Sequence, residues 1–480
     1  RRLASQGTVQ LWVRDFFLYM PAWLVSLVIH VVVLTLLGIF TIEDDDNDKY
    51  IILSTTVSRD AVEGEPDNPL ADDVQFDLPV PENVNLDNAA EREAMIKADQ
   101  DARELRIDPA TADPNWADLE EVKAVITSEG GGSALAARDP RIRAELVRRD
   151  GGTTLTEAAV ARGLRWLADQ QHDDGRWRLN RFPGCNCDGT GRIQSDPAAT
   201  SLALLPFLGA GNTHLRGLYK EEVAKGLRWL LSVQKPNGDL RHDSQGNSGM
   251  YAHGQGAIVL CEAYRMEGDE ALRVPAQKAI DFIVAAQHPA GGWRYSPGEA
   301  GDTSVVGWQL MALQSGKWAG LTVPESALEN AGHYLDSVQH RGGAQYGYQR
   351  GSQPTPTMSA EALLCRMYLG WTKSDPGLQE GVDLLVRNSL PSNDQPNIYY
   401  WYYGTQAMHH SGGVQWEMWN QRMRDILVNS QSKSGHSAGS WAPRDNHAHS
   451  GGRIYTTSLA VCTLEVYYRH LPLFRQIDLE

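Results

Sequence analysis

The 480-residue chain is poor in cysteine, and no basic patch in it suggests a nucleic-acid site. Five cysteines in a chain of this length are too few for a disulfide framework, which excludes the small disulfide-stabilised class of secreted proteins. Three of them lie in apolar stretches and are expected to be core residues. The lack of a basic patch and the formal net charge of −16 argue against a nucleic-acid partner.

Charged residues are missing from one 22-residue stretch, Pro21–Ile42, in which His30 is the only ionisable side chain. A helix needs about 20 residues to cross the hydrocarbon core of a bilayer. The stretch runs directly into Glu43 and the aspartates after it, with no small-residue cleavage site, so we expect an uncleaved transmembrane helix rather than a signal peptide. Residues 21–42 are therefore predicted to anchor the chain in a lipid membrane.

Basic residues precede this predicted span and acidic residues follow it. The positive-inside rule then places residues 1–20 in the cytoplasm and the rest outside the cytoplasmic membrane, as in a periplasmic protein. Residues 43–150 hold 28 acidic and 12 basic side chains, with scattered prolines. This composition predicts a largely extended acidic linker, which provides spacing and solubility or docks a basic protein partner.

Residues 151–480 contain an internal repeat. The segment Ala161–Leu167 (ARGLRWL) recurs as Ala224–Leu230 (AKGLRWL), and further copies follow at about 43 to 63 residues. Each copy begins with an amphipathic helix, continues through a glycine-rich loop and ends in a helix that is apolar on all sides. Such a helix has to be buried. The second helices are expected at Thr200–Leu208, Gly256–Tyr264, Val305–Leu313, Ala360–Leu369 and Thr457–Tyr467.

Two arrangements bury one helix of every pair: an open solenoid, or a ring of inner helices inside a ring of outer ones. The loops after the first helices favour the ring. Gln171-x-x-x-Gly175-x-Trp177 recurs in full once and in part three times. The other copies begin at Gln234, Gln287, Gln339 and Gln431, and the last carries a four-residue insertion before Gly439-x-Trp441. We expect the glutamine to bind backbone groups, the glycine to adopt a positive φ and the tryptophan to cover the turn.

These loops resemble the glutamine–tryptophan repeats of squalene cyclases over roughly residues 153–475. The chain is similar to membrane-anchored bacterial members of the squalene cyclase and prenyltransferase-repeat superfamily. The resemblance implies an all-α fold, an (α/α)6 toroid, for residues 151–480. The toroid would follow one transmembrane helix and the acidic linker.

The resemblance also identifies where an active site would lie. In squalene cyclases an acidic run at the start of an inner helix supplies the proton donor. The equivalent stretch here is Glu299–Val306, in which Asp302 matches the last acid and Glu299 the first, while Gly301 occupies the donor's position. Protonating an alkene needs a positioned acid, which glycine cannot provide. Ser304 stands where the related prenyltransferases have a zinc-binding thiolate, and no cofactor is identified.

Polar residues are expected at the starts of successive inner helices, around one mouth of the ring. They are Asp196, His253, Asp302, Thr357, Gln406 and Tyr455. Asp302, with Glu299 and His253, forms the candidate catalytic set, and Asp196, Thr357, Gln406 and Tyr455 form the candidate ligand-binding set. Asp196 and Asp302 have an alternative role as helix caps, and His253 as a hydrogen-bonded structural residue.

Two loops contain possible metal ligands. Cys185 and Cys187 could share a metal or oxidise, and His436, Asp445, His447 and His449 crowd the last loop. A solvated loop is the alternative for the histidines. The aromatic run Tyr399–Tyr403 either lines an apolar pocket or packs in the core.

The sequence therefore predicts a membrane-anchored binding or scaffold module for an apolar, isoprenoid-like ligand or for a protein partner. The enzymatic alternative is a divergent terpenoid cyclase or transferase that uses Asp302. A glycan-directed enzyme is a third possibility, although the sequence shows no convincing pair of carboxylates.

Overall fold

The structure is a computed structural model that describes residues 135–183 and 187–474. The chain divides into two units, 1–73 and 74–480, and the described residues belong to the second. The predicted anchor Pro21–Ile42 and most of the predicted linker lie outside the described residues. No helix within the described residues is long and apolar enough to cross a bilayer.

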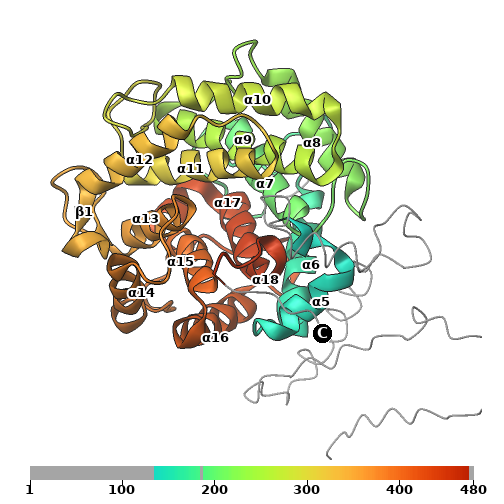
Figure 1. Ribbon diagram of the computed structural model, residues 1–480. Coiled ribbons are helices and arrows are strands. Elements are labelled where there is room, and N and C mark those ends of the chain that lie inside the picture. The colour runs from blue at the N-terminus through green and yellow to red at the C-terminus, as the bar shows by residue number, and fades with distance from the viewer. Residues whose placement is uncertain (1–134, 184–186, 475–480) are drawn as a thin grey trace, which may run out of the picture. The chain divides into compact units, whose positions relative to one another are not determined.

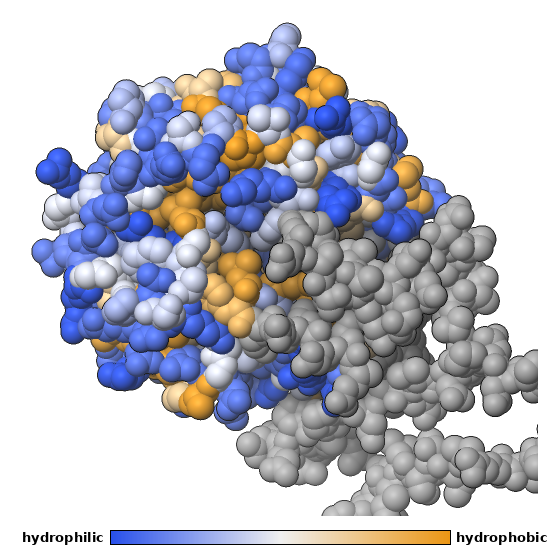
Figure 2. All heavy atoms as spheres, in the orientation of Figure 1, coloured by the Kyte–Doolittle hydropathy of each residue, from blue (hydrophilic) through white to orange (hydrophobic). Residues whose placement is uncertain are grey.

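Six amphipathic helices form the outer layer (Figure 1). They are α6 (Thr154–Asp169), α8 (Lys220–Val233), α10 (Glu270–Ala285), α12 (Glu325–Val338), α14 (Pro376–Asn388) and α16 (Gly413–Ser430). Each buries one apolar stripe and leaves its polar face to water, as its spacing of apolar residues predicts. Much of the described surface in Figure 2 is accordingly hydrophilic.

Six further helices form the inner layer. They are α7 (Asp196–Gly209), α9 (Gly249–Glu267), α11 (Thr303–Trp318), α13 (Pro356–Tyr368), α15 (Ile398–Ser411) and α17 (Asn446–Leu464). Every residue of α7 is buried. Each inner helix packs against the next, and α17 packs against α7 as well as α15. The six pairs therefore close into a ring, which confirms the predicted α/α toroid over the solenoid.

Polar contacts join the last repeat to the first. Gln431, after α16, donates from Nε2 to the carbonyl of Ala159 at 2.8 Å, and Arg162 Nε donates to Gln431 Oε1 at 2.9 Å. Both partners lie on α6, so these bonds cross the closure point of the ring.

Short elements complete the described fold. They are η1 (Ala136–Arg138), α5 (Pro140–Arg149), η2 (Gly246–Ser248), η3 (Arg341–Gly343), η4 (Gly435–Ser437), α18 (Val466–Arg469) and the two-residue strands β1 (Gln339–His340) and β2 (Gln345–Tyr346). The two strands pair antiparallel, with Gln339 opposite Tyr346. Gln339 is exposed at the start of this hairpin, whereas the other repeat glutamines bind backbone groups.

The glutamine of the repeat loop links two neighbouring repeats. Gln171 Nε2 donates to the carbonyl of Gly175 within its own loop and to that of Glu222 on α8, both at 2.9 Å. Gln287 makes the same pair of bonds to Gly291 and Ala327. Each glutamine thus satisfies a loop carbonyl and a carbonyl in the first turn of the next outer helix, which confirms its predicted role as scaffold.

The tryptophan of the loop is fully buried and donates from its indole N–H to the outer helix before it. Trp177 Nε1 lies 2.7 Å from the carbonyl of Leu167, and Trp293 and Trp441 make equivalent bonds. A buried indole N–H needs such a partner. The glycines between have positive φ, +95° at Gly175 and +91° at Gly291, as expected.

The first outer helix, α6, is capped by a reciprocal pair of threonines. Thr153 is the N-cap, its hydroxyl accepts from the N–H of Thr156, and the Thr156 hydroxyl accepts from the N–H of Thr153. The Thr156 hydroxyl makes the second bond of this capping box, and the Glu157 carboxylate pairs with Arg143 instead.

The end of the predicted linker is not extended. Residues 140–149 form helix α5, and Arg138 of η1 is buried against Glu262 of α9, with the Arg138 Nη1 to Glu262 Oε2 distance at 2.8 Å. Helical structure in the described residues therefore begins before the predicted boundary at residue 151. The net acidic composition of residues 43–150 concealed this, because it averages an acidic first part with a last part that is rich in arginine.

A substitution at Gly291 tests the loop geometry. A Cβ there would lie 1.9 Å from the carbonyl oxygen of Asn330, in addition to the unfavourable φ of +91°. We expect Gly291→Ala to lower the free energy of unfolding by about 3 kcal/mol or more. Gly298→Ala is the control, because Gly298 has a φ of +71° but no neighbouring atom within 4 Å. Its cost should be about 1 kcal/mol. Equal urea midpoints for the two variants would contradict this account.

Candidate functional site

Asp302 lies at the start of α11, where the sequence predicted it. Its Oδ1 accepts from the N–H of Val305 at 2.9 Å, so Asp302 caps the helix. The side chain is fully buried, and its Oδ2 lies 3.5 Å from Nε of Arg294. Burial raises the pKa of Asp302 to about 6, although hydrogen bonds from Val305 and Tyr348 act in the opposite direction.

Glu299 shares Arg294 with Asp302. Its Oε1 lies 3.3 Å from Arg294 Nη1, and its Oε2 accepts from the N–H of Ser296. Glu299 is partly exposed, so it lies at the outer edge of the group. The structure thus brings these two predicted residues together around one guanidinium.

Gly301 is required by close packing. A Cβ at position 301 would lie 2.7 Å from the Cα of Gly292 and 2.8 Å from the ring of Tyr334. The backbone between the two acids is therefore pressed against the preceding loop. No carboxylate could be built at this position without moving that loop, which explains the missing donor in structural terms.

A second fully buried acid of this mouth, Glu361 on α13, was not among the predicted residues. Its Oε1 accepts from the hydroxyl of Tyr399 at 3.0 Å. The Tyr399 and Ser304 hydroxyls lie 2.7 Å apart, and Tyr251 donates to Ser304 at 2.9 Å. These four side chains come from four different inner helices, α13, α15, α11 and α9, so they form one hydrogen-bonded chain across the ring.

Burial raises the pKa of Glu361 well above its usual value, and the hydrogen bond from Tyr399 only partly offsets this. The carboxyl fits beside Gly307, where a Cβ would approach Glu361 Oε1 to 2.0 Å. Its surroundings therefore favour the protonated form of the carboxyl. A single acid in the mostly apolar stretch 360–369, whose other charged residue is Arg366, was the signal that could have identified it, because a buried carboxyl needs partners or a proton.

His253 has the structural role that the sequence favoured. It is fully buried in α9, its Nδ1 accepts from the N–H of Leu240 at 3.1 Å, and its Nε2 lies 3.0 Å from the carbonyl of Ala279. Burial lowers the pKa of His253 to about 4, so the ring is neutral. One ring nitrogen binds the backbone of a loop and the other binds the backbone of an outer helix. His253 is therefore separate from the hydrogen-bonded chain that ends at Glu361.

Asp196 is the first residue of α7 and is not its cap. Ser195 caps this helix by accepting from the N–H of Ala198. The Asp196 carboxylate instead pairs with Arg176 at 3.0 Å and with Arg178 at 3.2 Å. The carboxylate is thus bound by two arginines of the preceding loop. The predicted capping role of Asp196 is wrong, because the residue before it is the cap.

The other candidate ligand-binding residues do not all lie at helix starts. They are Thr357, Gln406 and Tyr455. Thr357 is the second residue of α13 and accepts from Asn397 at 3.3 Å. Tyr455 follows the kink of α17 at Gly452. Gln406 lies deep within α15, which begins at Ile398, so its predicted place at the mouth is wrong. The aromatic residues before it are part of the helix rather than of the loop.

The aromatic run of α15 packs in the core. The ring of Trp308 stacks on Tyr402, with centroids 5.8 Å apart, and meets Tyr403 edge-on at 6.0 Å. All three side chains are fully buried. Of the two interpretations left open by the sequence, the structure supports core packing.

The described residues give no support to a metal site. Within 135–183 and 187–474, no group of three or more histidine, cysteine or acidic side chains could hold a metal ion. Cys187 is disulfide-bonded, whereas Cys185 lies outside the described residues. Asp445 caps α17 by accepting from the N–H of Ala448, and His447 and His449 are exposed.

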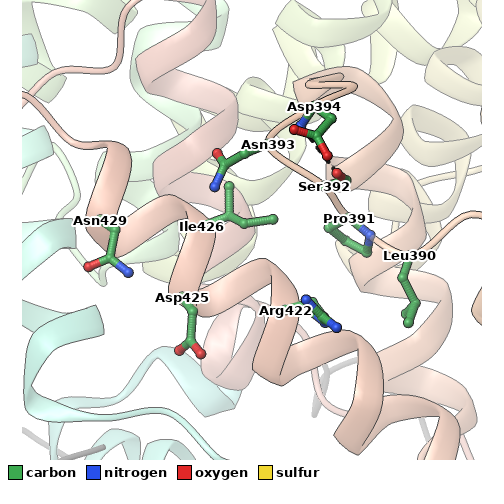
Figure 3. Close-up of a pocket in the computed structure, with 9 residues that line it drawn as sticks. All are labelled: Leu390, Pro391, Ser392, Asn393, Asp394, Arg422, Asp425, Ile426 and Asn429. Carbon is green, nitrogen blue, oxygen red and sulfur yellow. Dashed lines mark hydrogen bonds between the residues drawn. The ribbon is translucent and has the colours of Figure 1, made fainter. Parts of the chain in front are cut away.

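A pocket of about 580 Å³ opens on the outer surface, between α16 and the loop that follows α14 (Figure 3). One face of α16 lines it, since its four residues are spaced i, i+3, i+4 and i+7. They are Arg422, Asp425, Ile426 and Asn429, and the facing loop provides Leu390, Pro391, Ser392, Asn393 and Asp394. The lining combines both signs of charge with a small apolar floor.

Sequence comparisons connect the first repeats to a known family. A family model described as the squalene-hopene cyclase C-terminal domain matches residues 148–255. A curated squalene–hopene cyclase from Bradyrhizobium diazoefficiens is 28% identical over 41% of this chain and 31% of its own length. The chain therefore spans less than a third of that relative.

Similar solved structures have diverse activities. A type II terpene cyclase from Scytonema is 12% identical, with a TM-score of 0.46, and covers 65% of this chain and 97% of its own. An α-amylase from Clostridium perfringens is 11% identical, with a TM-score of 0.47, and covers 64% of this chain and 98% of its own. At this level of likeness neither structure argues for an activity.

The raised pKa of Asp302 predicts a pH-dependent stability. Between the ordinary value of about 3.9 and about 6, the folded state holds a proton that the unfolded state releases. The stability that this group provides is present below pH 4 and is lost as the pH rises to 6. Asp302→Asn keeps a capping oxygen but cannot titrate. Between pH 4 and pH 6 its free energy of unfolding should therefore fall by roughly 2 kcal/mol less than that of the wild type.

Urea titrations at pH 4 and pH 6 measure this difference. Glu299→Gln is the matched control, because Glu299 binds the same arginine but is partly exposed. The control should lose as much stability as the wild type. An undiminished loss in Asp302→Asn would show that Asp302 does not hold the proton.

Proposed function

We propose that this protein, whose repeat domain belongs to a squalene cyclase-like superfamily, is a membrane-tethered module. It would bind a protein partner on the outside of its ring. One observation carries this proposal: the interior of the described ring is occupied by the ring's own side chains. A module of this kind uses the toroid as a rigid support.

Side chains occupy the interior at both ends. At the starts of the inner helices, the chain from Tyr251 to Glu361 crosses the ring, and Trp308 packs beneath it against Tyr402. At the opposite end Arg138 is buried against Glu262. An isoprenoid chain would have to displace these groups, several of which are hydrogen-bonded and buried.

The pocket beside α16 has the chemistry of a protein-binding site. Arg422, Asp425 and Asp394 offer charges of both signs, and Ile426 and Pro391 offer a small apolar surface, as Figure 3 shows. A purely apolar ligand would desolvate these charges without compensating them. A peptide segment can pair with them and also cover Ile426.

The predicted anchor and acidic linker complete the proposal. A span at residues 21–42 would hold the protein in the cytoplasmic membrane, with the ring on the extracytoplasmic side. The linker would set how far from the bilayer the ring can meet its partner.

Site-specific photocrosslinking in the native membrane tests the partner site. A photoreactive amino acid in place of Asn429, in the pocket, should capture one protein reproducibly. The same probe at Glu329, on the exposed face of α12, serves as the control. The charge reversal Arg422→Glu should weaken the capture about tenfold, the equivalent of about 1.4 kcal/mol. Identical products at both positions, or capture that is indifferent to Arg422→Glu, would contradict the proposal.

The second candidate is a divergent terpenoid cyclase or transferase. It is favoured by one specific observation: burial raises the pKa of Asp302 to about 6, and Asp302 lies at the same mouth as Glu361, whose pKa burial also raises. A proton donor needs a carboxyl that stays protonated near the operating pH.

Turnover assays distinguish this candidate. Incubation with isoprenoid substrates should give a cyclised or transferred product by mass spectrometry, and Asp302→Asn should abolish it while Glu329→Gln, on the exposed face of α12, retains it. Product that persists in Asp302→Asn would exclude Asp302 as the donor.

A further inference from the structure

Arg138 lies inside the ring, at the end where the inner helices finish. It precedes the first repeat in the chain, yet its side chain is only 1% exposed. Its Nη1 lies 2.8 Å from Glu262 Oε2 on α9, and its Nε donates to the carbonyl of Arg469 on α18 at 3.0 Å. Burial removes the Arg138 guanidinium from water. This costs free energy unless specific acceptors replace the hydrogen bonds that water made.

The acceptors surround the planar group on several sides. Besides Glu262 and the carbonyl of Arg469, Nη1 lies 3.4 Å from the carbonyl of Leu208 on α7 and 3.6 Å from Sδ of Met266. Nη2 lies 3.4 Å from Nε2 of His470. Donors that point in several fixed directions in one plane suit a guanidinium, whereas an ammonium would reach only part of the set.

Charge balance also depends on this residue. Burial alone would raise the pKa of Glu262, but Arg138 and Arg469 together hold it well below its usual range. Arg469 divides its guanidinium between Glu262 at 3.4 Å and Glu465 at 3.2 Å. Arg138 therefore provides the closest cation to Glu262.

The backbone around Arg138 fits the ring closely as well. A Cβ at Gly211, in the turn after α7, would lie 2.8 Å from the carbonyl oxygen of Arg138. Along α5, Arg143 pairs with Glu157 of α6 at 2.6 Å and donates to the hydroxyl of Tyr468 at 2.8 Å. Residues 135–149 are thus attached to the ring by polar contacts of two arginines and by the buried side chains of Ala137, Leu146 and Val147.

We infer that this end of the ring is a guanidinium-binding socket, formed by Glu262 with the carbonyls of Leu208 and Arg469, and that Arg138 occupies it to hold residues 135–149 as a detachable strap. The site lies apart from the pocket of the proposed function and does not depend on it. Its ligand class is a guanidinium, and its occupant in this structure is the chain's own arginine. The strap connects residues 1–134 to the first repeat. Whether Arg138 occupies the socket therefore determines whether this end of the ring is closed.

Chemical rescue in the full-length protein, purified in mild detergent, tests the socket. Hydrogen exchange of the peptide that covers residues 135–149 is measured by mass spectrometry. Arg138→Ala should raise the exchange rate of this peptide at least about tenfold, while peptides of α9 and α11 keep their protection. Millimolar methylguanidinium should restore the protection, and equal methylammonium should not.

Arg148→Ala is the matched control, because Arg148 is exposed on the same strap and pairs only with Glu145. It should leave the exchange unchanged. Unaltered protection in Arg138→Ala, or equal rescue by both cations, would overturn the inference. If Arg138→Ala does not fold, Arg138→Lys replaces it and should loosen the strap alone. Loss of protection throughout the ring in both variants would show that the strap is an inseparable part of the fold.

Discussion

Helices that are apolar around their whole circumference have to be shielded from water on every side, and this requirement organises the described structure. Six such helices shield one another only when the last packs against the first, as α17 packs against α7. The outer helices, the loop glutamines and the buried tryptophans then serve this closed ring. Gln431 shows the dependence most clearly, because it binds the carbonyl of Ala159 across the closure point.

The same requirement explains how far the sequence could predict the fold. The spacing of apolar residues and the loops at Gln171 and Gln287 predicted the paired helices, the positive φ of the glycines and the closed ring. Helix starts were less certain, because they depend on which of several neighbouring hydroxyls or carboxylates reaches the free N–H groups. Ser195 rather than Asp196 caps α7 for this reason, since Arg176 and Arg178 bind the aspartate.

The candidate site was only partly visible in the sequence. Asp302 and Glu299 were identified through a local motif, and the structure brings them together around Arg294. Glu361 was missed because its partners, Tyr399 and Ser304, are distant in sequence and meet only when the ring closes. Arg138 was missed because it belongs to a segment whose composition indicated an extended linker. Gln406 was misplaced because the helix start at Asn397, whose side chain caps α15 by accepting from the N–H of Tyr400, was not recognised before the aromatic run.

The proposed function depends on an interior that is filled by the protein's own side chains, from Trp308 to Arg138. Mass spectrometry of organic-solvent extracts tests this claim most directly, with the full-length protein purified from its native membrane in mild detergent. The account predicts only the lipids of the surrounding membrane, in amounts that fall with further washing. A stoichiometric isoprenoid that survives washing, and that is lost when Gly256→Trp crowds the ring, would contradict it.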